Sequence, residues 1–311
     1  MKYDLIIIGS GAAGLSAALY AGRYKMKTLV IAGEFGGETA TAGKIENYPG
    51  VLSIDGYDLM KTMRNQAESL GTEIVEEWAT MVQKEEDEFR VITREGVSYG
   101  GRAIIFALGS RRRHLNLSNE KELVGKGVHY CWTCDGPLYG GKTVLMVGGG
   151  DSSVKGANFL AEYAEKVYLL TREKELRAEP VNLERMKKLG TKVEVILERH
   201  VTEIVGTGML EKVVLSQSFQ GKSELFVDGL FIEIGFDPDT ALPKSLGLAL
   251  DDKNFIQVDT MMRTNIQGAF AAGDTTLHFG NFKQDITAAA LGAVAATSAY
   301  EYYKNLASRE P

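Results

Sequence analysis

The chain has 311 residues, enough for two domains of ordinary size. Its composition is globular, with 44% hydrophobic residues, and its net charge of −6 argues against a nucleic-acid binder, which normally carries a basic face. No apolar run approaches the roughly 20 residues of a membrane span and the first residues lack the layout of a signal peptide, so we expect a soluble, cytoplasmic protein.

The first predicted unit covers residues 3–34, YDLIIIGSGAAGLSAALYAGRYKMKTLVIAGE. An apolar β run precedes Gly9-x-Gly11-x-x-Gly14, and a helical pattern and a second β run follow, which is the dinucleotide-binding fingerprint in its required context. Gly9 permits the tight turn, Gly11 lets the backbone approach a pyrophosphate, and Gly14 lets helix and strand pack closely. The helix N-terminus then offers N–H groups to the phosphates. The alternative is a glycine turn that arose by chance.

A second copy of this pattern covers residues 142–173, with Gly148-x-Gly150-x-x-Ser153 after its first strand. Ser153 replaces the third small apolar or glycine residue, so a unit retained only as a scaffold is the alternative. Neither copy has an acidic residue directly at the end of its second strand, where one usually binds a ribose. Glu34 and Glu173 follow two residues later. Glu34 can reach an adenosine ribose or can be a solvated loop charge.

Three later segments fit the first unit. Residues 102–110 predict a buried strand that ends in Gly109, residues 268–274 predict a similar strand that ends in Asp274, and residues 283–303 predict a long helix of small residues suited to close packing. The expected fold class is α/β, with two Rossmann-like three-layer domains, the second inserted into the first. We expect the first domain to comprise 1–112 and 243–311, and the inserted domain 113–242.

The only two cysteines lie in CWTCDG, residues 131–136. A structural zinc needs four ligands, and the four histidines include no His-x₃₋₅-His pair, so we expect no metal site. A purely structural disulfide over so short a loop would remove little chain entropy. A redox pair fits better, because Cys-x-x-Cys brings two sulfurs close enough to form and break a bond. Asp135 can pass a proton to or from a departing thiolate, and it can also cap the next turn.

These motifs together resemble the low-molecular-weight thioredoxin reductases over essentially the whole chain. The matching pieces are GSGAAG, GGETATAGKIENYPG at 36–50, CWTCDG, GGGDSS, IGFDP and AAGDTT. The resemblance implies a split FAD-binding domain and an inserted pyridine-nucleotide-type domain that carries the redox disulfide. It also implies a homodimer in which the inserted domain rotates to present the cysteines alternately to flavin and partner.

The resemblance also implies the site residues. Cys131, Cys134 and Asp135 would be catalytic, with Cys134 nearer the flavin and Asp135 the proton donor. The FAD-binding set would be Gly9, Ser10, Gly11, Ala13, Gly14, Glu34, Gly37, Glu38, Thr39, Asn47, Ala79, Gly109, Gly273, Asp274, Lys283, Gln284 and Asp285. The set that binds NADH or NADPH would be Gly148, Gly150, Ser152, Ser153, Arg172, Glu173 and Arg177.

The chain departs from the family after the second unit's second strand. NADPH-using members carry His-Arg-Arg-x-x-x-Arg there, whereas residues 171–177 read TREKELR. Glu173 therefore replaces one arginine, and its carboxylate would repel a 2′-phosphate but accept a hydrogen bond from a free 2′-OH. We expect that NADPH is not strongly preferred over NADH, with a mere surface charge as the alternative.

Two more departures concern Lys155-Gly156, where many NADPH users have two glutamates, and Asp285, where the family usually has a small apolar residue. Relatives without such glutamates include some that take electrons from ferredoxin or a deazaflavin. Asp285 is either a favourable charge in the first turn of a helix or a charge that lowers the flavin's potential.

The sequence therefore predicts a thioredoxin-disulfide reductase-like flavoprotein that passes electrons from a reduced nicotinamide through FAD and the Cys131/Cys134 pair to a thioredoxin-like or glutaredoxin-like protein. The alternatives are the same relay fed by ferredoxin or a deazaflavin, a flavin-dependent dithiol oxidase, and a non-enzymatic nucleotide-binding module. Nucleic acid and membrane are not among the expected partners.

Overall fold

The computed structural model describes residues 2–280 and 282–308. Two compact units divide these residues: one holds the chain up to Arg111 and from Pro238 onward, and the other is Arg112–Asp237. The second unit is thus inserted into the first, and the α/β class with parallel sheets is confirmed. The expected domain bounds, 1–112 with 243–311 and 113–242, stay a prediction.

The first unit is built on a sheet in the order β5-β2-β1-β8-β7-β6, with β19 also paired to β8. Strands β5, β2, β1, β8 and β19 run parallel, and β7 and β6 are antiparallel additions at one side. The strands are β1 (Lys2–Ile8), β2 (Thr28–Ile31), β5 (Glu73–Val75), β6 (Ala79–Glu85), β7 (Glu88–Thr93), β8 (Ser98–Phe106) and β19 (Ala269–Ala271), with a separate pair β3 (Lys44–Ile45) and β4 (Ile54–Asp55).

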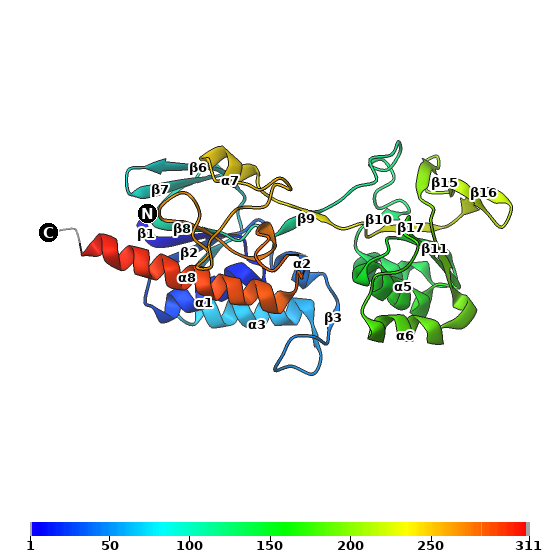
Figure 1. Ribbon diagram of the computed structural model, residues 1–311, viewed down its shortest axis with the longest axis horizontal. Helices are drawn as coiled ribbons and strands as arrows, with labels where there is room; N and C mark the ends of the chain where they lie inside the picture. The colour runs from blue at the N-terminus through cyan, green and yellow to red at the C-terminus, as the bar shows by residue number, and fades with distance from the viewer. Residues whose placement is uncertain (1, 281, 309–311) are drawn as a thin grey trace. The chain divides into compact units, whose positions relative to one another are not determined.

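Both faces of this parallel sheet are buried, as near-continuous apolar strands require. Leu5 and Ile7 of β1 pack on the face covered by helices, and Ile6 and Ile8 pack on the opposite face. The helices of the unit are α1 (Ala12–Arg23), α2 (Gly37–Ala40), α3 (Gly56–Glu68), α7 (Ala241–Leu246) and α8 (Asp285–Ala307), with a 3₁₀ turn η3 (Gly273–Thr275). Figure 1 shows α1, α3 and α8 together beneath the sheet.

Helix α8 is confirmed as the long helix of small residues that packs closely. A methyl group on Gly292 would lie 2.0 Å from the carbonyl oxygen of Ala13 in α1. The buried Ser16 hydroxyl donates to the Ala289 carbonyl, 2.7 Å away. Small side chains on both helices permit this contact, and it fixes the helix that begins at Asp285 against the helix that begins after Gly11.

The inserted unit has a five-stranded parallel sheet in the order β10-β17-β11-β12-β13 and a three-stranded antiparallel sheet β14-β15-β16. The strands are β10 (Val128–His129), β11 (Thr143–Val147), β12 (Lys166–Leu170), β13 (Val193–Ile196), β14 (Val201–Val205), β15 (Lys212–Phe219), β16 (Lys222–Phe226) and β17 (Gly229–Ile232). The helices are α4 (Trp132–Asp135), α5 (Asp151–Tyr163) and α6 (Pro180–Lys188), with 3₁₀ turns η1 (Gly136–Tyr139) and η2 (Gly190–Lys192).

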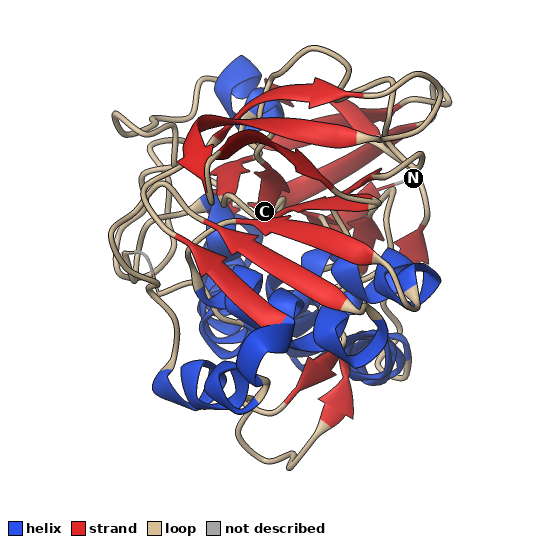
Figure 2. Ribbon diagram, turned by 90° about the vertical axis from the view of Figure 1, so that its right-hand side faces the viewer, coloured by secondary structure: helices blue, strands red, loops and turns tan. Residues whose placement is uncertain are grey.

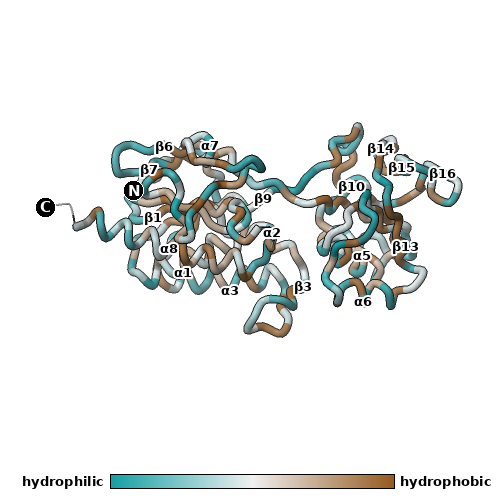
Figure 3. Tube along the Cα trace, in the orientation of Figure 1, coloured by the Kyte–Doolittle hydropathy of each residue, from teal (hydrophilic) through white to brown (hydrophobic). Residues whose placement is uncertain are grey.

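The parallel sheet of the inserted unit lies between helices and the antiparallel sheet. Val144 and Met146 of β11 pack with α5, whereas Leu145 and Val147 pack with β14 and β15. Figure 2 shows the helices below the strands in this unit, and Figure 3 shows that apolar sequence follows its parallel strands. The layer order is therefore helix, parallel sheet, antiparallel sheet.

Strands β9 (Ser110–Arg112) and β18 (Phe236–Pro238) pair where the chain passes between the units. Arg111 bonds Asp239 at 2.7 Å on the first unit's side. Arg113 bonds Asp237 at 2.7 Å on the inserted unit's side. Arg111 and Arg113 are thus paired with carboxylates in and directly after β18.

Candidate functional site

The β1–α1 turn has the shape that the first glycine motif predicts. Gly9 has φ +110°, and a methyl group there would lie 2.2 Å from the Ala107 carbonyl oxygen. A methyl group on Gly14 would lie 1.9 Å from the Gly9 carbonyl oxygen. By contrast, among residues 2–280 and 282–308 the nearest atom to a methyl group on Gly11, apart from its own chain neighbours and helix, would be the Gly36 carbonyl oxygen at 3.9 Å. The first and third glycines therefore let protein pack on protein, and the second faces free space.

Helix α1 begins at this free space without a side-chain cap. Helix α3, by comparison, is capped by Asp55, whose carboxylate accepts from the Tyr57 N–H. An uncapped first turn leaves backbone N–H groups for another acceptor. Ala13 lies in this first turn and contacts Gly273, where a methyl group would lie 2.9 Å from the Ala13 Cβ. The geometry fits a pyrophosphate.

Ser10 does not direct its hydroxyl to this space. It donates to the Glu34 carbonyl at 2.9 Å and accepts from the Gly36 N–H at 3.2 Å. Ser10 therefore holds the loop after β2 against the glycine turn, and a methyl group on Gly37 would lie 3.6 Å from the Gly11 Cα. The predicted residues at 9–14 and 37 are brought together, whereas the Glu34 and Glu38 side chains are exposed.

Trp78 is a site candidate that the sequence analysis missed. A methyl group on Gly33 would lie 2.1 Å from the indole, so the ring lies directly on the backbone at the end of β2. Ala79, the predicted adenine contact, begins β6 next to it. The ribose and adenine of a dinucleotide lie at the end of the second strand in Rossmann units. Gly33, two residues after that strand, was the available signal for such an aromatic neighbour.

Residues near 39–47 and 284–285 meet through side chains, although they are far apart in sequence. The Thr39 hydroxyl donates to Asp285 Oδ1 at 2.6 Å, and the Asn47 amide donates to Gln284 Oε1 at 2.8 Å. Gln284 caps α8, and its N–H donates to the Thr287 hydroxyl at 3.2 Å. All four predicted residues thus converge at the start of α8. Asp285 lies in the first turn of α8, where both interpretations of its charge place it, so the choice between them stays open.

Asp274 and Lys283 are also neighbours. Lys283 donates to the Asp274 carbonyl at 2.6 Å and lies 4.3 Å from the centre of the Phe255 ring. Burial raises the pKa of Asp274, and the nearby Lys283 opposes that rise. Burial lowers the pKa of Lys283, and Asp274 opposes that fall. Asp274 and Lys283 are therefore partly shielded from water at this end of the sheet.

Two predicted strands end earlier than expected. β8 ends at Phe106, three residues before Gly109, and β19 ends at Ala271, before the 3₁₀ turn that contains Asp274. Gly109 has φ +64° and accepts from the Asp239 N–H at 3.2 Å. The glycine turns the backbone out of the sheet toward β9. Pattern reasoning extended the strands because the residues after them are also apolar.

The second glycine turn repeats the first one. Gly148 has φ +147°, and a methyl group there would lie 2.1 Å from the Glu233 carbonyl oxygen. In the part of the chain that the structure describes, a methyl group on Gly150 would have no neighbour within 4 Å beyond its own turn and helix, and α5 begins there without a side-chain cap. The Ser153 hydroxyl donates to the Gly150 carbonyl at 2.7 Å, and Ser152 is exposed. Ser153 therefore packs in place of a third glycine and leaves the free space intact.

Arg172, Glu173 and Arg177 form one cluster after β12. Glu173 Oε1 lies 3.2 Å from Arg177 Nη2 and 3.6 Å from Arg172 Nε. The Arg177 N–H also donates to the Gly149 carbonyl at 2.7 Å, which ties the cluster to the glycine turn. The three side chains are 39–80% exposed. The carboxylate thus neutralises the guanidinium groups that would otherwise be available to an anion.

A disulfide joins Cys131, the residue that caps the short helix α4, to Cys134 within that helix. Cys131 Sγ accepts from the Cys134 N–H at 3.2 Å and lies 3.3 Å from the Thr133 hydroxyl. Cys134 is exposed, and Cys131 is half-buried. The pair forms the redox-competent arrangement that its spacing predicted.

Asp135 has a partner that the sequence analysis did not identify. Its Oδ2 lies 3.0 Å from His129 Nδ1, and His129 Nε2 lies 2.6 Å from the Tyr139 hydroxyl. The side chain of Asp135 makes no capping hydrogen bond to η1, so that alternative is wrong. Burial, together with the charges of Asp135 and Asp228, raises the pKa of Tyr139 to about 12. A series of polar contacts therefore leads from Asp135 through His129 to Tyr139, in the interior of the inserted unit.

Trp132 covers the helix that follows the second glycine turn. A methyl group on Gly156 would lie 3.0 Å from the indole, and the Phe159 ring centre is 5.3 Å away. Gly156 of the Lys155-Gly156 pair is therefore explained by packing, because a larger residue would displace Trp132.

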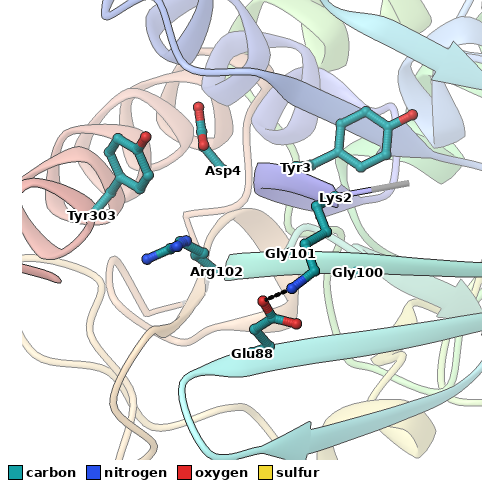
Figure 4. A pocket seen from close by; sticks show the side chains of 8 residues that line it. All are labelled: Lys2, Tyr3, Asp4, Glu88, Gly100, Gly101, Arg102 and Tyr303. Atoms are coloured by element: carbon teal, nitrogen blue, oxygen red, sulfur yellow. Dashed lines mark hydrogen bonds and ion pairs between the residues drawn. The ribbon is translucent and has the colours of Figure 1, made fainter. Parts of the chain in front are cut away.

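A hollow at the start of β1 is not part of this site. It has a volume of about 260 Å³ and is lined by Lys2, Glu88, Arg102 and Tyr303, among others (Figure 4). The glycine turn follows the opposite, carboxyl end of β1, where ligands of open α/β sheets bind. Residues 2–280 and 282–308 contain no cluster of metal-ligating side chains and no helix long and apolar enough to cross a bilayer.

Comparisons with known proteins agree with this geometry. The pyridine nucleotide-disulphide oxidoreductase family matches residues 3–296. The chain is 38% identical over 303 residues to the 34.2 kDa protein in the rubredoxin operon of Clostridium pasteurianum, covering 97% of each. It is 39% identical to the thioredoxin reductase of Listeria innocua, covering 98% of this chain and 95% of that one. The structure of Lactococcus lactis thioredoxin reductase matches with a TM-score of 0.92 at 35% identity, over 97% of this chain and 99% of that one.

Proposed function

The chain belongs to the pyridine nucleotide-disulphide oxidoreductase family, and we propose that it passes electrons from a reduced nicotinamide nucleotide through FAD and the Cys131–Cys134 disulfide to a thioredoxin. The observation that supports this proposal is the disulfide itself, formed by a Cys-x-x-Cys pair that precedes the second of the two glycine turns in the sequence. A dithiol that opens and closes needs a two-electron donor, and two dinucleotide sites supply one. The enzyme is a thioredoxin-disulfide reductase-like oxidoreductase.

The first unit is the proposed FAD-binding domain. The uncapped N-terminus of α1 beside Gly11 would hold the pyrophosphate, and the residues that converge at the start of α8 would hold the ribityl chain and flavin. When bound, FAD supplies two-electron exchange between a nicotinamide and a disulfide. The fit rests on free space at Gly11 with protein packed tightly on either side of it.

The inserted unit is the proposed nicotinamide-nucleotide domain. The backbone N–H groups beside Gly150 would hold the pyrophosphate at the uncapped start of α5, where Ser152 is exposed, while Gly148 and Ser153 shape the turn by packing on protein. Ser153 packs without filling the space beside Gly150, which favours a nucleotide-binding site over a unit retained only as a scaffold. Thus both units keep the free space that a dinucleotide needs.

The cluster around Glu173 favours NADH at least as much as NADPH. A 2′-phosphate would have to displace the Glu173 carboxylate from Arg172 and Arg177 before these could bind it. A ribose 2′-OH can instead donate to that carboxylate. We therefore propose that NADPH gains no large advantage from its extra phosphate.

The contacts of the two sulfurs favour Cys131 as the one that carries negative charge when the disulfide opens. The Cys134 N–H and the Thr133 hydroxyl both lie within donor distance of Cys131 Sγ. A thiolate is the nucleophile in disulfide exchange, and donors stabilise it. We propose that the Cys131 thiolate attacks the partner and that Asp135 transfers the proton.

The partner is proposed to be a thioredoxin, since relatives that match nearly the full chain are thioredoxin reductases. Leu138, three residues after Asp135, is 74% exposed and offers an apolar contact close in sequence to the disulfide. We also propose a homodimer, which sedimentation velocity tests directly.

Steady-state reduction of a purified bacterial thioredoxin by the FAD-loaded enzyme tests the function. We expect NADH-dependent formation of thioredoxin thiols, which Cys134→Ser abolishes because the variant cannot close the disulfide. Peroxide formation without thioredoxin reduction would favour an oxidase. Activity with reduced ferredoxin but with neither NADH nor NADPH would show that the second glycine turn does not bind the electron donor.

A further inference from the structure

His129 is buried, is absent from the expected site and lies two residues before Cys131. It stands on β10, and its ring stacks on Phe231 of β17 with the centroids 5.1 Å apart. The titratable groups that face it are Asp135 of α4, at 3.0 Å from Nδ1, and Tyr139 of η1, at 2.6 Å from Nε2. A buried imidazole with a polar partner on each nitrogen is fixed both in position and in tautomer.

The tautomer of His129 follows from the chemistry of its two neighbours. An ionised Asp135 has no hydrogen to donate, so the tautomer with its hydrogen on Nδ1, the nitrogen 3.0 Å from Oδ2, is favoured. A neutral ring then accepts at Nε2, and the Tyr139 hydroxyl donates to it. Tyr139 is suited to this role because burial and the charges of Asp135 and Asp228 keep its hydroxyl protonated, with the pKa raised to about 12.

We propose that His129 is a positioning residue for Asp135, which it holds by one carboxylate oxygen so that the other exchanges the proton in thiol–disulfide exchange. Oδ1 of Asp135 has no hydrogen-bond partner among residues 2–280 and 282–308. Tyr139 in turn fixes the tautomer of His129. This inference rests on the proposed function, because it assigns a role within the exchange with thioredoxin.

The step balances as follows. One thiol of the reduced enzyme gives its proton to Oδ1, and the resulting thiolate attacks the disulfide of thioredoxin, forming a mixed disulfide and releasing one thioredoxin sulfur. That sulfur takes the proton from Asp135. The second enzyme sulfur then attacks its neighbour in the mixed disulfide, Cys131–Cys134 closes, and the second thioredoxin sulfur leaves with the remaining proton. Two electrons and two protons pass to thioredoxin.

The test isolates this half-reaction from nicotinamide and flavin chemistry. FAD-loaded enzyme is reduced with dithiothreitol, freed of reductant, mixed anaerobically with oxidised bacterial thioredoxin, and quenched with acid and iodoacetamide. The variants are His129→Leu, which removes both ring nitrogens, and His129→Asn, whose amide N–H can replace Nδ1–H. His114→Leu is the matched control, because His114 lies 2.7 Å from the Tyr130 hydroxyl in a separate network.

We expect His129→Leu to slow exchange about tenfold or more, since positioned proton transfer contributes about 100-fold or more. His129→Asn should recover most of the rate, and His114→Leu should match the wild type. The loss should shrink with dithiobis(nitrobenzoate) as the disulfide, because its leaving thiolate departs without a proton.

Equal losses with both disulfides, or no recovery in His129→Asn, would show that His129 only supports the shape of the motif and would overturn the inference. A wild-type rate in His129→Leu would overturn it as well while leaving the function intact. A wild-type enzyme that fails to reduce thioredoxin in this assay would instead refute the function.

Discussion

Replacing Glu173 with glutamine should raise the efficiency with which the enzyme uses NADPH. In the wild type the Glu173 carboxylate holds Arg177 at 3.2 Å and Arg172 at 3.6 Å. A 2′-phosphate that binds these guanidinium groups has to replace the carboxylate and lose both ion pairs. Glutamine has a similar shape and no charge, so the arginines become available to the phosphate at little cost.

The expected size of this effect follows from the exposure of the cluster. The side chains are 80%, 39% and 71% exposed for Arg172, Glu173 and Arg177. An exposed ion pair is worth about 0.2–1 kcal/mol, so two such pairs oppose the phosphate by about 0.4–2 kcal/mol. At about 1.4 kcal/mol for each factor of ten, kcat/KM for NADPH should rise about 2- to 30-fold relative to that for NADH.

The assay is steady-state reduction of thioredoxin with each nucleotide in turn, at low ionic strength because salt screens exposed charges. Glu175→Gln is the matched control: it removes the same charge from the same loop, and Glu175 forms no ion pair among the described residues. Two exposed ion pairs that compete with the 2′-phosphate should leave the wild type without a large preference for NADPH, so a kcat/KM ratio above about 100 would mean that they do not compete with it effectively. Such a preference, or an equal response of both variants, would refute the reasoning.

Three further predictions concern the first glycine turn, the disulfide and Tyr139. Gly14→Ala should lower the thermal unfolding midpoint, because the new methyl group would lie 1.9 Å from the Gly9 carbonyl oxygen. Gly11→Ala should keep the wild-type midpoint but bind FAD more weakly. Equal melting curves for the two variants would contradict this. Cys134→Ser should accumulate a mixed disulfide with thioredoxin and Cys131→Ser should not, as non-reducing electrophoresis shows, and the opposite result would reassign the attacking sulfur. The pKa of Tyr139 is raised to about 12, so its contribution to stability is present below about pH 10 and is lost as the pH rises through 12. Tyr139→Phe should therefore lose less of its guanidinium midpoint between pH 9 and pH 11 than the wild type does.

The fold was accessible to sequence reasoning because its signals are local. Each glycine motif lies between a buried strand and a helix, and the spacing of apolar residues predicts both elements. Strand ends were less accurate: β8 stops at Phe106 because Gly109 turns the chain outward, although the sequence stays apolar up to that point.

The contacts within the candidate site were less predictable, since they join distant segments. No pattern pairs Thr39 with Asp285, or Trp78 with the backbone of Gly33. His129 was visible as a residue near the thiols, but its role depends on Tyr139, which the turn of η1 brings back to the ring. A lone histidine gives no sequence signal that separates a satisfied core residue from one that orients a carboxylate.

The most direct test of the account is anaerobic reduction of the FAD-loaded enzyme with NADH, NADPH and reduced ferredoxin in turn. Flavin absorbance is followed during each titration, and the state of Cys131 and Cys134 is read by alkylation and mass spectrometry. The account predicts that NADH bleaches the flavin and that both cysteines become alkylated. A purified protein that binds no FAD, or a flavin that bleaches while the disulfide stays closed, would contradict it.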